Sequence, residues 1–559
     1  MLEVRIMGVP VPVGYEFFDE IIRNKSYYID KTELLYELLA VNPAKVSLIT
    51  RPRRFGKSLN MSMIECFLNI KRDSRDLFKG LAIAKNEDLC REWMNQYPVL
   101  FFTLKDVEGL TFKSAYGMLK ALISDLCGGN NNIKNAAIDD DDRKIFQKLR
   151  DKTANEDEVK QSLVIISRLM YLTYEKPVVL LIDEYDVPLA KARENGYYRE
   201  MLDVIRGLLS NALKSNDYIK LAVITGCLRI AKESIFTGVN NFKSYSVLDN
   251  KFSQRFGFTQ EEMDKLLEDA NLTEKREMIR EWYDGYVFGD TSVYCPWDVV
   301  NYVDDVQCDS EQPPKNYWKN TSGNAILREF VENDNFSVND KFETLMNGGS
   351  IQQTISDELT YDTLLLTEDN FWSVLLMTGY LTKADPKEKG STVSLKIPNT
   401  EVATIFEDTV TRFFADTVDT QRLKSLMDAL WSGNAEKASE LFSDLLFDTI
   451  SYMNYHEDYY HAFLAGLFVG RGYEVDSNKE RGLGRPDIVL KDRKNRRAII
   501  FEAKKSTAED HMSADSQKAL LQIISMEYAK NLKGYRQIMI YGIAFFEKEA
   551  LAAGGKHPL

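Results

Sequence analysis

The chain contains 559 residues, more than one hydrophobic core usually organises, so we expect about three domains. Its formal net charge of −14 argues against a surface coated with nucleic-acid-binding groups, so any contact with DNA or RNA must come from a local basic patch. No apolar stretch approaches the roughly 20 residues that span a bilayer, the N-terminus lacks the pattern of a signal peptide, and the six cysteines never form a CxxC pair. We therefore expect a cytoplasmic protein with reduced thiols and without a membrane contact, a disulfide framework or a zinc site.

Short apolar strands alternate with helical patterns in the first half of the chain. The strand candidates are "KVSLIT" at 45–50, "PVVLLID" at 177–183 and "KLAVITG" at 220–226. This alternation predicts a parallel sheet covered by helices on both faces. Later residues are mainly helical in pattern up to about 440, and a helix, a strand pair and a further helix follow. We predict an α/β protein with domains at residues 1–258, 259–440 and 441–559.

The stretch "LITRPRRFGKSLNMS" follows the first strand candidate and ends like a phosphate-binding loop. Gly56 would let the backbone approach the phosphates, Lys57 would neutralise the β- and γ-phosphates, and the Ser58 hydroxyl would bind Mg²⁺. The loop also lies where a helix begins, so it presents backbone N–H groups and the positive end of a helix dipole. However, the signature requires its first glycine where this chain has Arg51. A basic turn with a chance "GKS" is therefore the alternative interpretation.

The second strand candidate decides between these interpretations, because it ends in Asp183 and Glu184. In ATPases with such a loop, the aspartate orients Mg²⁺ and the glutamate polarises the attacking water. An acidic pair after a strand can also cap a helix, but the two fragments together, in this order and at strand ends, make chance a poor explanation. The third strand ends at Thr225, which can sense the γ-phosphate, and Arg229 lies either near that phosphate or in a surface salt bridge. The sequence therefore predicts an ATP site, with Ser58 and Asp183 as its Mg²⁺ ligands.

Five stretches of the chain resemble the bacterial AAA-ATPase-like family, many of whose members carry a C-terminal PD-(D/E)xK nuclease-like domain. They are "YYIDKTELLYELL", "VSLITRPRRFGKSLNMSM", "LLIDEYD", "FTGVNNF" and "WYDGYVFG…VYCPWDVVNYV". The resemblance implies an N-terminal P-loop ATPase domain and a helical middle region that follows it as a lid. It also implies that the arginine-rich loop is the normal form, with Arg53, Arg54 and Phe55 part of the nucleotide site and Arg53 or Arg54 adding charge around the phosphates.

A second set of acidic residues lies near the C-terminus, in "RPDIVLKDRKNRRAIIFEAKK". This stretch predicts two strands joined by a polar turn, with Asp487 at the start of the first and Glu502 and Lys504 on one face of the second. A hairpin can bring the two carboxylates together, and with the Ala503 carbonyl they would form an oxygen-rich site for Mg²⁺ or Mn²⁺. A metal there would activate water, while Lys504 positions it or stabilises the phosphorane. The pattern is similar to the PD-(D/E)xK core and implies a C-terminal α/β domain of the restriction-endonuclease type.

The residues that flank this core each have two possible interpretations. Glu457 stands where such nucleases often place a further acidic metal ligand, or it stabilises the start of a helix. Gln522 and Tyr528 lie either near the scissile phosphate or on an ordinary helix surface. Two of the histidines, His456 and His461, lack a partner cluster, so we interpret them as structural rather than as metal ligands.

Charge is unevenly distributed along the chain. Residues 477–505 contain ten lysines and arginines against four aspartates and glutamates, a net charge of +6. Such a stretch suits phosphate contacts, although a solvated basic turn has the same composition. No helix-turn-helix or zinc-finger spacing indicates reading of a defined base sequence.

Two functions from different classes follow from these motifs. The first is an ATP-binding and ATP-hydrolysing protein coupled to a metal-dependent nuclease, with ATP and Mg²⁺ as cofactors, Mn²⁺ as a further candidate at the nuclease site, and DNA favoured over RNA as the partner. Mobile elements or defence would be its setting. The second is a nucleotide-switched signalling or interaction protein whose nuclease-like domain is a non-catalytic platform. Intact Asp487, Glu502 and Lys504 favour the first function. A motor ATPase is a weaker third interpretation, because no secure arginine finger can be identified in this chain. The sequence leaves oligomerisation open.

Overall fold

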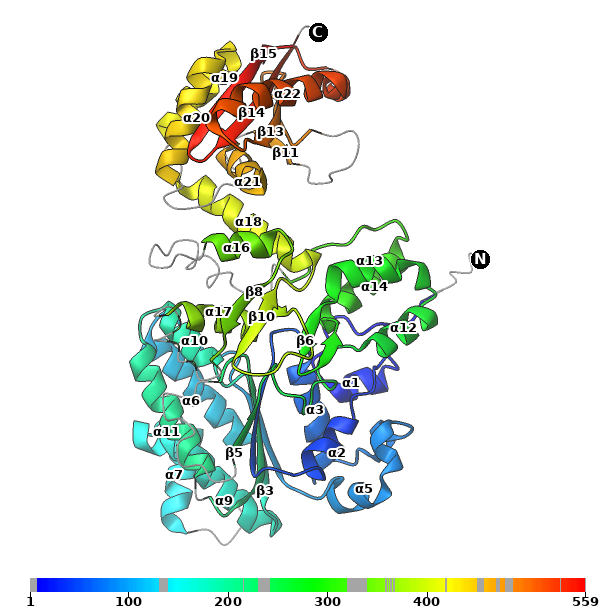
Figure 1. Ribbon diagram of the computed structural model, residues 1–559. Helices are drawn as coiled ribbons and strands as arrows, with labels where there is room; N and C mark the ends of the chain where they lie inside the picture. Colours follow the sequence, from blue (N-terminus) through cyan, green and yellow to red (C-terminus); the bar gives the residue numbers. More distant parts are fainter. Residues whose placement is uncertain are drawn as a thin grey trace. The chain divides into compact units, whose positions relative to one another are not determined.

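The chain forms two compact units. Unit 1 comprises Met1–Trp318 and Ser350–Glu401, and unit 2 comprises Lys319–Gly349 and Val402–Leu559. The computed structural model describes residues 8–129, 139–214, 216–229, 242–318, 339–356, 359, 361, 364, 367–417, 420–449, 457–468, 473–477, 486–532 and 534–557 (Figure 1).

A five-stranded parallel sheet lies at the centre of unit 1, in the order β2-β3-β4-β1-β5. Its strands are β1 (Val46–Thr50), β2 (Val99–Thr103), β3 (Val178–Asp183), β4 (Ile219–Gly226) and β5 (Phe242–Tyr245). Every residue of β1 and β3 is buried, as expected for apolar strands covered on both faces. The predicted parallel sheet is confirmed, and β4 lies between β1 and β3.

Helices cover both faces of this sheet. Figure 1 shows α1, α2 and α3 on one side and α6, α9 and α11 on the other. The helices of this part are α1 (Phe18–Arg23), α2 (Glu33–Leu39), α3 (Lys57–Leu68), α4 (Arg75–Phe78), α5 (Glu87–Trp93), α6 (Phe112–Gly128), α7 (Asp140–Arg150), α8 (Glu156–Lys160), α9 (Ser162–Tyr174), α10 (Val187–Glu194) and α11 (Tyr198–Leu213).

The rest of unit 1 is mainly helical but also contains short strands. Its helices are α12 (Gln260–Asp269), α13 (Arg276–Tyr283), α14 (Pro296–Cys308) and α17 (Glu368–Thr378). A hairpin of β6 (Tyr286–Phe288) and β7 (Thr291–Val293) lies between α13 and α14 in the chain, and β8 (Ile351–Thr354), β9 (Thr382–Lys383) and β10 (Thr392–Lys396) form a small sheet. The aromatic residues of this region fill its core, as Tyr283, Tyr294 and Tyr302 show.

Unit 2 is built on a second five-stranded sheet, in the order β11-β12-β13-β14-β15. Its strands are β11 (Glu474–Ser477), β12 (Ile488–Asp492), β13 (Arg497–Lys505), β14 (Gln537–Phe546) and β15 (Glu549–Lys556), and its helices are α16 (Asn339–Met346), α18 (Thr400–Thr417, which begins in unit 1), α19 (Thr420–Ser432), α20 (Ala435–Thr449), α21 (Glu457–Phe468) and α22 (Met512–Ser525). Only β13 and β14 are parallel, and α22 connects them. Because Gly542 has no side chain, this helix packs directly against β14: a Cβ there would lie 2.3 Å from the Leu520 nitrogen.

The grouping of the chain differs from the predicted boundaries. Helices α19 and α20 pack with the C-terminal sheet, and residues 259–318 and 350–401 pack with the N-terminal sheet. Division into three domains at 258 and 440 stays a prediction from the sequence.

Candidate functional site

The loop between β1 and α3 has the backbone geometry of a phosphate cradle. Gly56 is the N-cap of α3 and adopts a left-handed conformation, with φ 77°. No atom lies within 4 Å of the point where a Cβ would stand on Gly56, so the space above the start of α3 is open. A ligand with negative charge is stabilised there by the N–H groups and dipole of α3.

Arg51, at the position of the missing glycine, points away from this space and into the protein. Its guanidinium is fully buried, and Nη1 donates to the carbonyl oxygens of Thr50 at 2.8 Å, Tyr245 at 3.1 Å and Ser246 at 2.8 Å. Burial lowers the pKa of this guanidinium to about 10. The arginine therefore ties the start of the loop to the end of β5, and the loop keeps its course without the first glycine.

Restoring the signature with Arg51→Gly is expected to harm the protein. Hydrogen bonds from a charged donor contribute about 1.5–3 kcal/mol each, so we expect the free energy of unfolding to fall by roughly 3 kcal/mol or more. Denaturant unfolding measures this free energy. Arg51→Lys keeps the charge but loses the fork of donors, so its free energy of unfolding should lie between those of wild type and Arg51→Gly. An Arg51→Gly protein as stable as wild type would show that this side chain does not hold the loop.

Lys57 lies at the first position of α3 with its ammonium group buried. Nζ donates to the carbonyl oxygens of Arg51 at 3.2 Å and Pro52 at 3.1 Å, and lies 3.3 Å from Oε1 of Glu184. Burial by itself would lower the pKa of Lys57, but Cys227 and the carboxylates of Glu184 and its neighbours raise it above its ordinary value. The residue is therefore a fixed positive charge at the mouth of the loop.

Ser58, Asp183 and Thr225 meet where β3 and β4 end and α3 begins. Ser58 Oγ donates to Oδ2 of Asp183 at 2.6 Å, and Thr225 Oγ1 donates to its Oδ1 at 2.5 Å. The sheet order explains this arrangement, because the strand ending at Thr225 lies beside both β1 and β3. Burial raises the pKa of Asp183, and the charge of Glu184 adds to this effect. A hydroxyl and a carboxylate in direct contact fit the ligand set of Mg²⁺.

Glu184 follows β3 in a left-handed conformation, with φ 54°, which is uncommon for a residue with a side chain. One of its oxygens faces Lys57, and the other, Oε2, is buried and makes no hydrogen bond to any described residue. Unsatisfied buried carboxylate oxygens are rare and require an explanation. This oxygen can therefore accept a hydrogen bond from a group that the described residues do not supply.

Asp186 is a member of this site that the sequence analysis missed. It is buried, and its Oδ2 accepts from the backbone N–H groups of Cys227 at 3.0 Å and Leu228 at 2.9 Å. Tyr361 adds a longer contact to the same oxygen, at 3.4 Å. Burial and the charge of Glu184 raise the pKa of Asp186 to about 6. The carboxyl group of Asp186 thus holds the backbone that follows β4. In the sequence, the only indication of this role was the place of Asp186 in "LLIDEYD".

The other predicted loop residues divide into two groups. Arg53 lies among the charges of the site, because Cys227, Asp186 and Glu184 raise its pKa even though burial opposes them. Arg54 instead stacks on the ring of Trp297 at 4.0 Å, and Phe55 is buried against Tyr286 and Phe288. The structure therefore places Arg53, but not the side chains of Arg54 and Phe55, beside Lys57.

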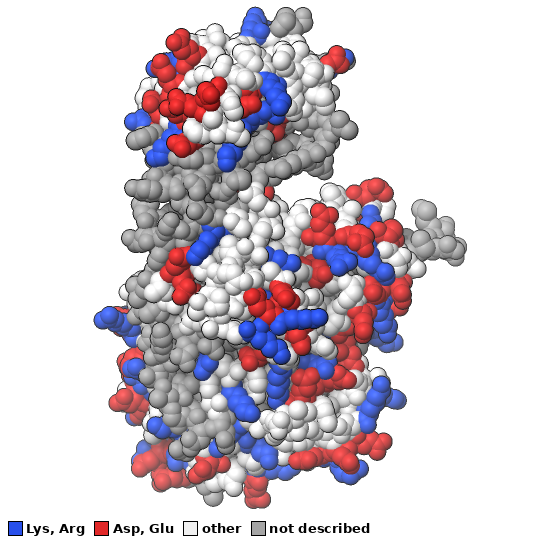
Figure 2. Space-filling view, viewed as in Figure 1, with Lys and Arg blue, Asp and Glu red and all other residues white. Residues whose placement is uncertain are grey.

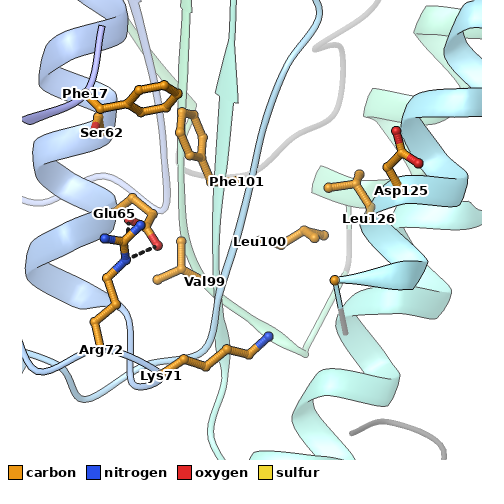
Figure 3. A pocket seen from close by; sticks show the side chains of 11 residues that line it. Phe17, Ser62, Glu65, Lys71, Arg72, Val99, Leu100, Phe101, Asp125 and Leu126 are labelled. Carbon is orange, nitrogen blue, oxygen red and sulfur yellow. Dashed lines mark hydrogen bonds and ion pairs between the residues drawn. The ribbon is translucent and has the colours of Figure 1, made fainter. Parts of the chain in front are cut away.

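A cavity of about 250 Å³ lies elsewhere in unit 1 (Figure 3). The close-up shows it between α3 and α6, at the edge of the sheet formed by β2. Its wall includes Ser62, Glu65, Val99 and Asp125 and none of the loop residues from Arg51 to Ser58. It is therefore separate from the phosphate loop.

In unit 2, Asp487 and Glu502 lie side by side. The antiparallel register of β12 and β13 pairs Ile488 with Phe501, so Asp487, just before β12, stands opposite Glu502. Oδ2 of Asp487 accepts from the N–H of Ala503 at 2.8 Å. Glu502 is buried, while Lys504 is half-buried farther along β13. The predicted strand pair is confirmed, and the catalytic and metal roles of these residues stay predictions.

Helix α22 and the residues after it supply polar groups to the same place. Gln522 Nε2 donates to Oε1 of Glu502, and the buried Tyr528 has its pKa raised by burial and by the nearby charge of Glu502. Nε2 of His461 lies 3.0 Å from the backbone carbonyl oxygen of Asp487, a contact that fits a structural role. Glu457 begins α21, but its side chain lies outside the described residues, and so does all of His456.

The fit of this place to a metal ion is partial. No group of three or more acidic, histidine or cysteine side chains able to hold a metal occurs among the described residues. Two carboxylates and the Ala503 carbonyl nevertheless supply oxygen ligands of the kind that Mg²⁺ and Mn²⁺ take. Since Mg²⁺ usually keeps several waters and takes only one or two carboxylates, the residues fit a hydrated divalent cation.

The basic stretch 477–505 is less available for phosphates than its composition indicates. Lys491 pairs with Asp476, Arg493 with Glu474, and Arg497 with Asp492. On the face of the protein drawn in Figure 2, lysines and arginines alternate with acidic residues over unit 1. Asp476 and Glu474 lie outside the stretch, so their two pairs neutralise part of its +6 charge, and residues 478–485 lie outside the described part of the chain.

Comparison with known families agrees with the architecture predicted from the sequence. Residues 12–236 match the family model described as "Predicted AAA-ATPase", and residues 455–553 match that of the PD-(D/E)XK nuclease superfamily. A protein of Azotobacter chroococcum mcd 1, named "Uncharacterized protein in vnfD 5'region", is 24% identical over 493 residues, which is 86% of each chain. No helix of the described residues is long and apolar enough to cross a membrane. The chain thus combines an ATPase-type region with a nuclease-type region.

Proposed function

We propose that this chain, with its ATPase-type and nuclease-type regions, binds and hydrolyses ATP and cleaves nucleic acid phosphodiesters, and that the ATP site controls access to the nuclease site. One observation carries the proposal: each unit gathers, at the ends of its strands, the charged groups that its own phosphate chemistry requires. Lys57, Asp183 and Glu184 meet in unit 1, and Asp487 and Glu502 meet in unit 2.

In the ATP site, each side chain has a distinct role. Lys57 and the N–H groups at the start of α3 bind the β- and γ-phosphates, and Ser58 and Asp183 would hold Mg²⁺, which neutralises developing charge on the phosphates when bound. Glu184 accepts a hydrogen bond from the attacking water through Oε2. Thr225 holds the carboxylate of Asp183, and Arg53 adds positive charge near the γ-phosphate.

In the nuclease site, Asp487 and Glu502 would hold a divalent cation, which supplies an activated water and stabilises negative charge on the phosphate when bound. Gln522 orients the carboxylate of Glu502. Lys504 positions the water or stabilises the phosphorane. DNA is the favoured substrate, and mobile elements or defence are the favoured setting.

The experiment that tests the ATP half is Glu184→Gln. The amide removes the negative charge that polarises the attacking water but leaves Lys57 and Ser58 in place, so ATP should bind as in wild type while hydrolysis falls about 100-fold or more. Binding is measured by titration calorimetry and hydrolysis by phosphate release. Glu194→Gln, at an exposed acidic residue that ends α10, is the matched control and should hydrolyse normally. Normal hydrolysis by Glu184→Gln would exclude this role.

The second candidate is the nucleotide-switched interaction protein, with unit 2 as a non-catalytic platform. The internal ion pairs of Lys491, Arg493 and Arg497 favour it, because they engage charges that a nuclease would direct at its substrate. A panel of single- and double-stranded DNA and RNA, incubated with Mn²⁺ and with or without ATP, distinguishes the two candidates. Cleavage supports the nuclease, and binding without cleavage supports the platform.

A further inference from the structure

The chain passes from unit 1 to unit 2 at two places, and a hydrogen bond inside unit 1 links the residues at these places. The chain leaves unit 1 after Trp318 and again after Glu401. The backbone N–H of Trp318 donates to Oε1 of Glu401 at 2.9 Å, and the side chain of Asn316 donates to the Glu401 carbonyl at 3.2 Å. Glu401 lies in the first turn of α18, which continues into unit 2 as far as Thr417. A change at Glu401 therefore acts on both passages together.

Glu401 shares its surroundings with a second buried acid, Asp298, from the first turn of α14. Both side chains are fully buried. Burial raises the pKa of Asp298, and burial together with the charge of Asp298 raises the pKa of Glu401. Buried carboxyl groups destabilise a fold relative to well-packed apolar side chains, so stability does not explain the pair.

The residues just before Asp298 in the chain contact the phosphate loop at Arg54. Cys295, one turn before Asp298, directs its Sγ to the carbonyl oxygen of Arg54 at 3.8 Å. The guanidinium of Arg54 stacks on Trp297, the residue before Asp298 in the chain, and Asp298 acts electrostatically on Arg54. Residues 295–298 are therefore in a position to respond to a change in the course of the loop at Arg54.

A second contact route leads from the loop to the same place. Pro52 packs on Gly379, the C-cap of α17, so closely that a Cβ on the glycine would lie 3.0 Å from the ring of the proline. The next residue, Tyr380, packs edge-on against Trp318, with ring centroids 4.9 Å apart. This second chain of contacts thus links the loop to the passage point at Trp318.

We propose that Asp298, Glu401 and Trp318 form a relay through which nucleotide at the phosphate loop changes the two chain passages at Trp318 and Glu401. The inference rests on the proposed function, because it requires the loop to bind nucleotide. The three side chains are positioning residues: they touch neither the phosphates nor the nuclease carboxylates. A ligand shifts such an element only if it favours one of its arrangements, and the loop contacts at Pro52 and Arg54 supply that differential contact.

Hydrogen–deuterium exchange on the full chain tests the relay without relying on cleavage. Wild type is measured with and without a non-hydrolysable ATP analogue and Mg²⁺, in peptides that contain Trp318 and Glu401. We expect the analogue to change exchange in both peptides. Glu401→Leu keeps the volume but removes the hydrogen bond to Trp318, so the change should be lost while the affinity for the analogue stays that of wild type. Glu401→Gln retains an acceptor for Trp318 and should restore the change.

Glu388→Gln is the matched control, because Glu388 binds Ser394 in the same part of unit 1 without touching the relay. Asp298→Asn provides a second variant if Glu401→Leu unfolds. A full nucleotide response in both Glu401→Leu and Asp298→Asn would overturn the relay and leave the proposed ATP site standing. A loss of nucleotide affinity in both would also overturn it, because the pair would then belong to the binding site. Absence of nucleotide binding by wild type would instead refute the proposed function.

Discussion

The Lys57→Ala substitution is expected to abolish binding of ATP with Mg²⁺. The ammonium group of Lys57 is buried, and two loop carbonyls and Glu184 fix its position in the loop. Removing one partner of a buried, hydrogen-bonded charge pair costs about 2–5 kcal/mol, which corresponds to a loss of affinity on the order of 100-fold or more. Titration calorimetry with ATP and Mg²⁺ measures this loss directly.

The control for this substitution is Lys71→Ala, just beyond the C-terminal end of the same helix. Lys71 is exposed and lies outside the phosphate loop, so its removal should leave ATP binding unchanged. Thermal unfolding of both variants separates a lost contact from a lost fold. Equal ATP affinity in wild type and Lys57→Ala would contradict the assignment of the loop.

The sequence predicted the parts of the ATP site that are local in the chain. A glycine, a lysine and a serine at the start of a helix, and two acids at the end of a buried strand, are recognisable because each set lies within a few residues. Arg51 shows the limit of such patterns. Its departure from the signature indicated a changed loop, but only the structure shows that its side chain is buried against carbonyls of Tyr245 and Ser246, almost 200 residues later.

Contacts between distant parts of the chain explain what the sequence analysis missed. Asp186 had no spacing signal of its own, because its partners Cys227 and Leu228 belong to another strand end. The pair of Asp298 and Glu401 is invisible in the sequence for the same reason. The pair of β12 and β13 was predictable because a short turn joins the two strands and a hairpin register follows. The basic charge of that turn was overvalued, since composition does not show which arginines find acidic partners.

The two sites differ in the source of their positive charge. In unit 1, the positive group of Lys57 is already fixed beside the acids of the site. In unit 2, Glu502 receives a hydrogen bond from the neutral Gln522, and the nearest basic residue on its strand, Lys504, is half-buried. In the proposed function, a divalent cation would supply the positive charge of the second site, whereas Lys57 supplies that of the first. A substitution of the carboxylates in unit 2 should therefore leave the charged groups around Lys57 as they are.

The Glu502→Ala substitution is expected to abolish cleavage of nucleic acid and to leave ATP hydrolysis measurable. Glu502 is one of two carboxylates that would hold the cation, and loss of a group that stabilises charge in the transition state lowers rates about 100-fold or more. Cleavage of labelled DNA with Mn²⁺ and phosphate release from ATP are measured on the same preparation. Glu509→Gln, at an exposed acid in the turn before α22, is the control and should cleave as wild type. Cleavage by Glu502→Ala at the wild-type rate would refute the nuclease assignment.

The same assay decides whether ATP controls the nuclease. The cleavage chemistry requires a cation and water but no nucleotide, so ATP acts on it only by favouring one arrangement of the chain over another. If it does, Lys57→Ala should change the rate of cleavage or remove its dependence on ATP, while Mn²⁺ still supports the reaction. Glu184→Gln should bind ATP without hydrolysing it, so its rate of nucleic acid cleavage should stay at the value of the ATP-bound protein. If cleavage by wild type is real but is insensitive both to ATP and to Lys57→Ala, the two sites act independently and control of access by ATP is wrong.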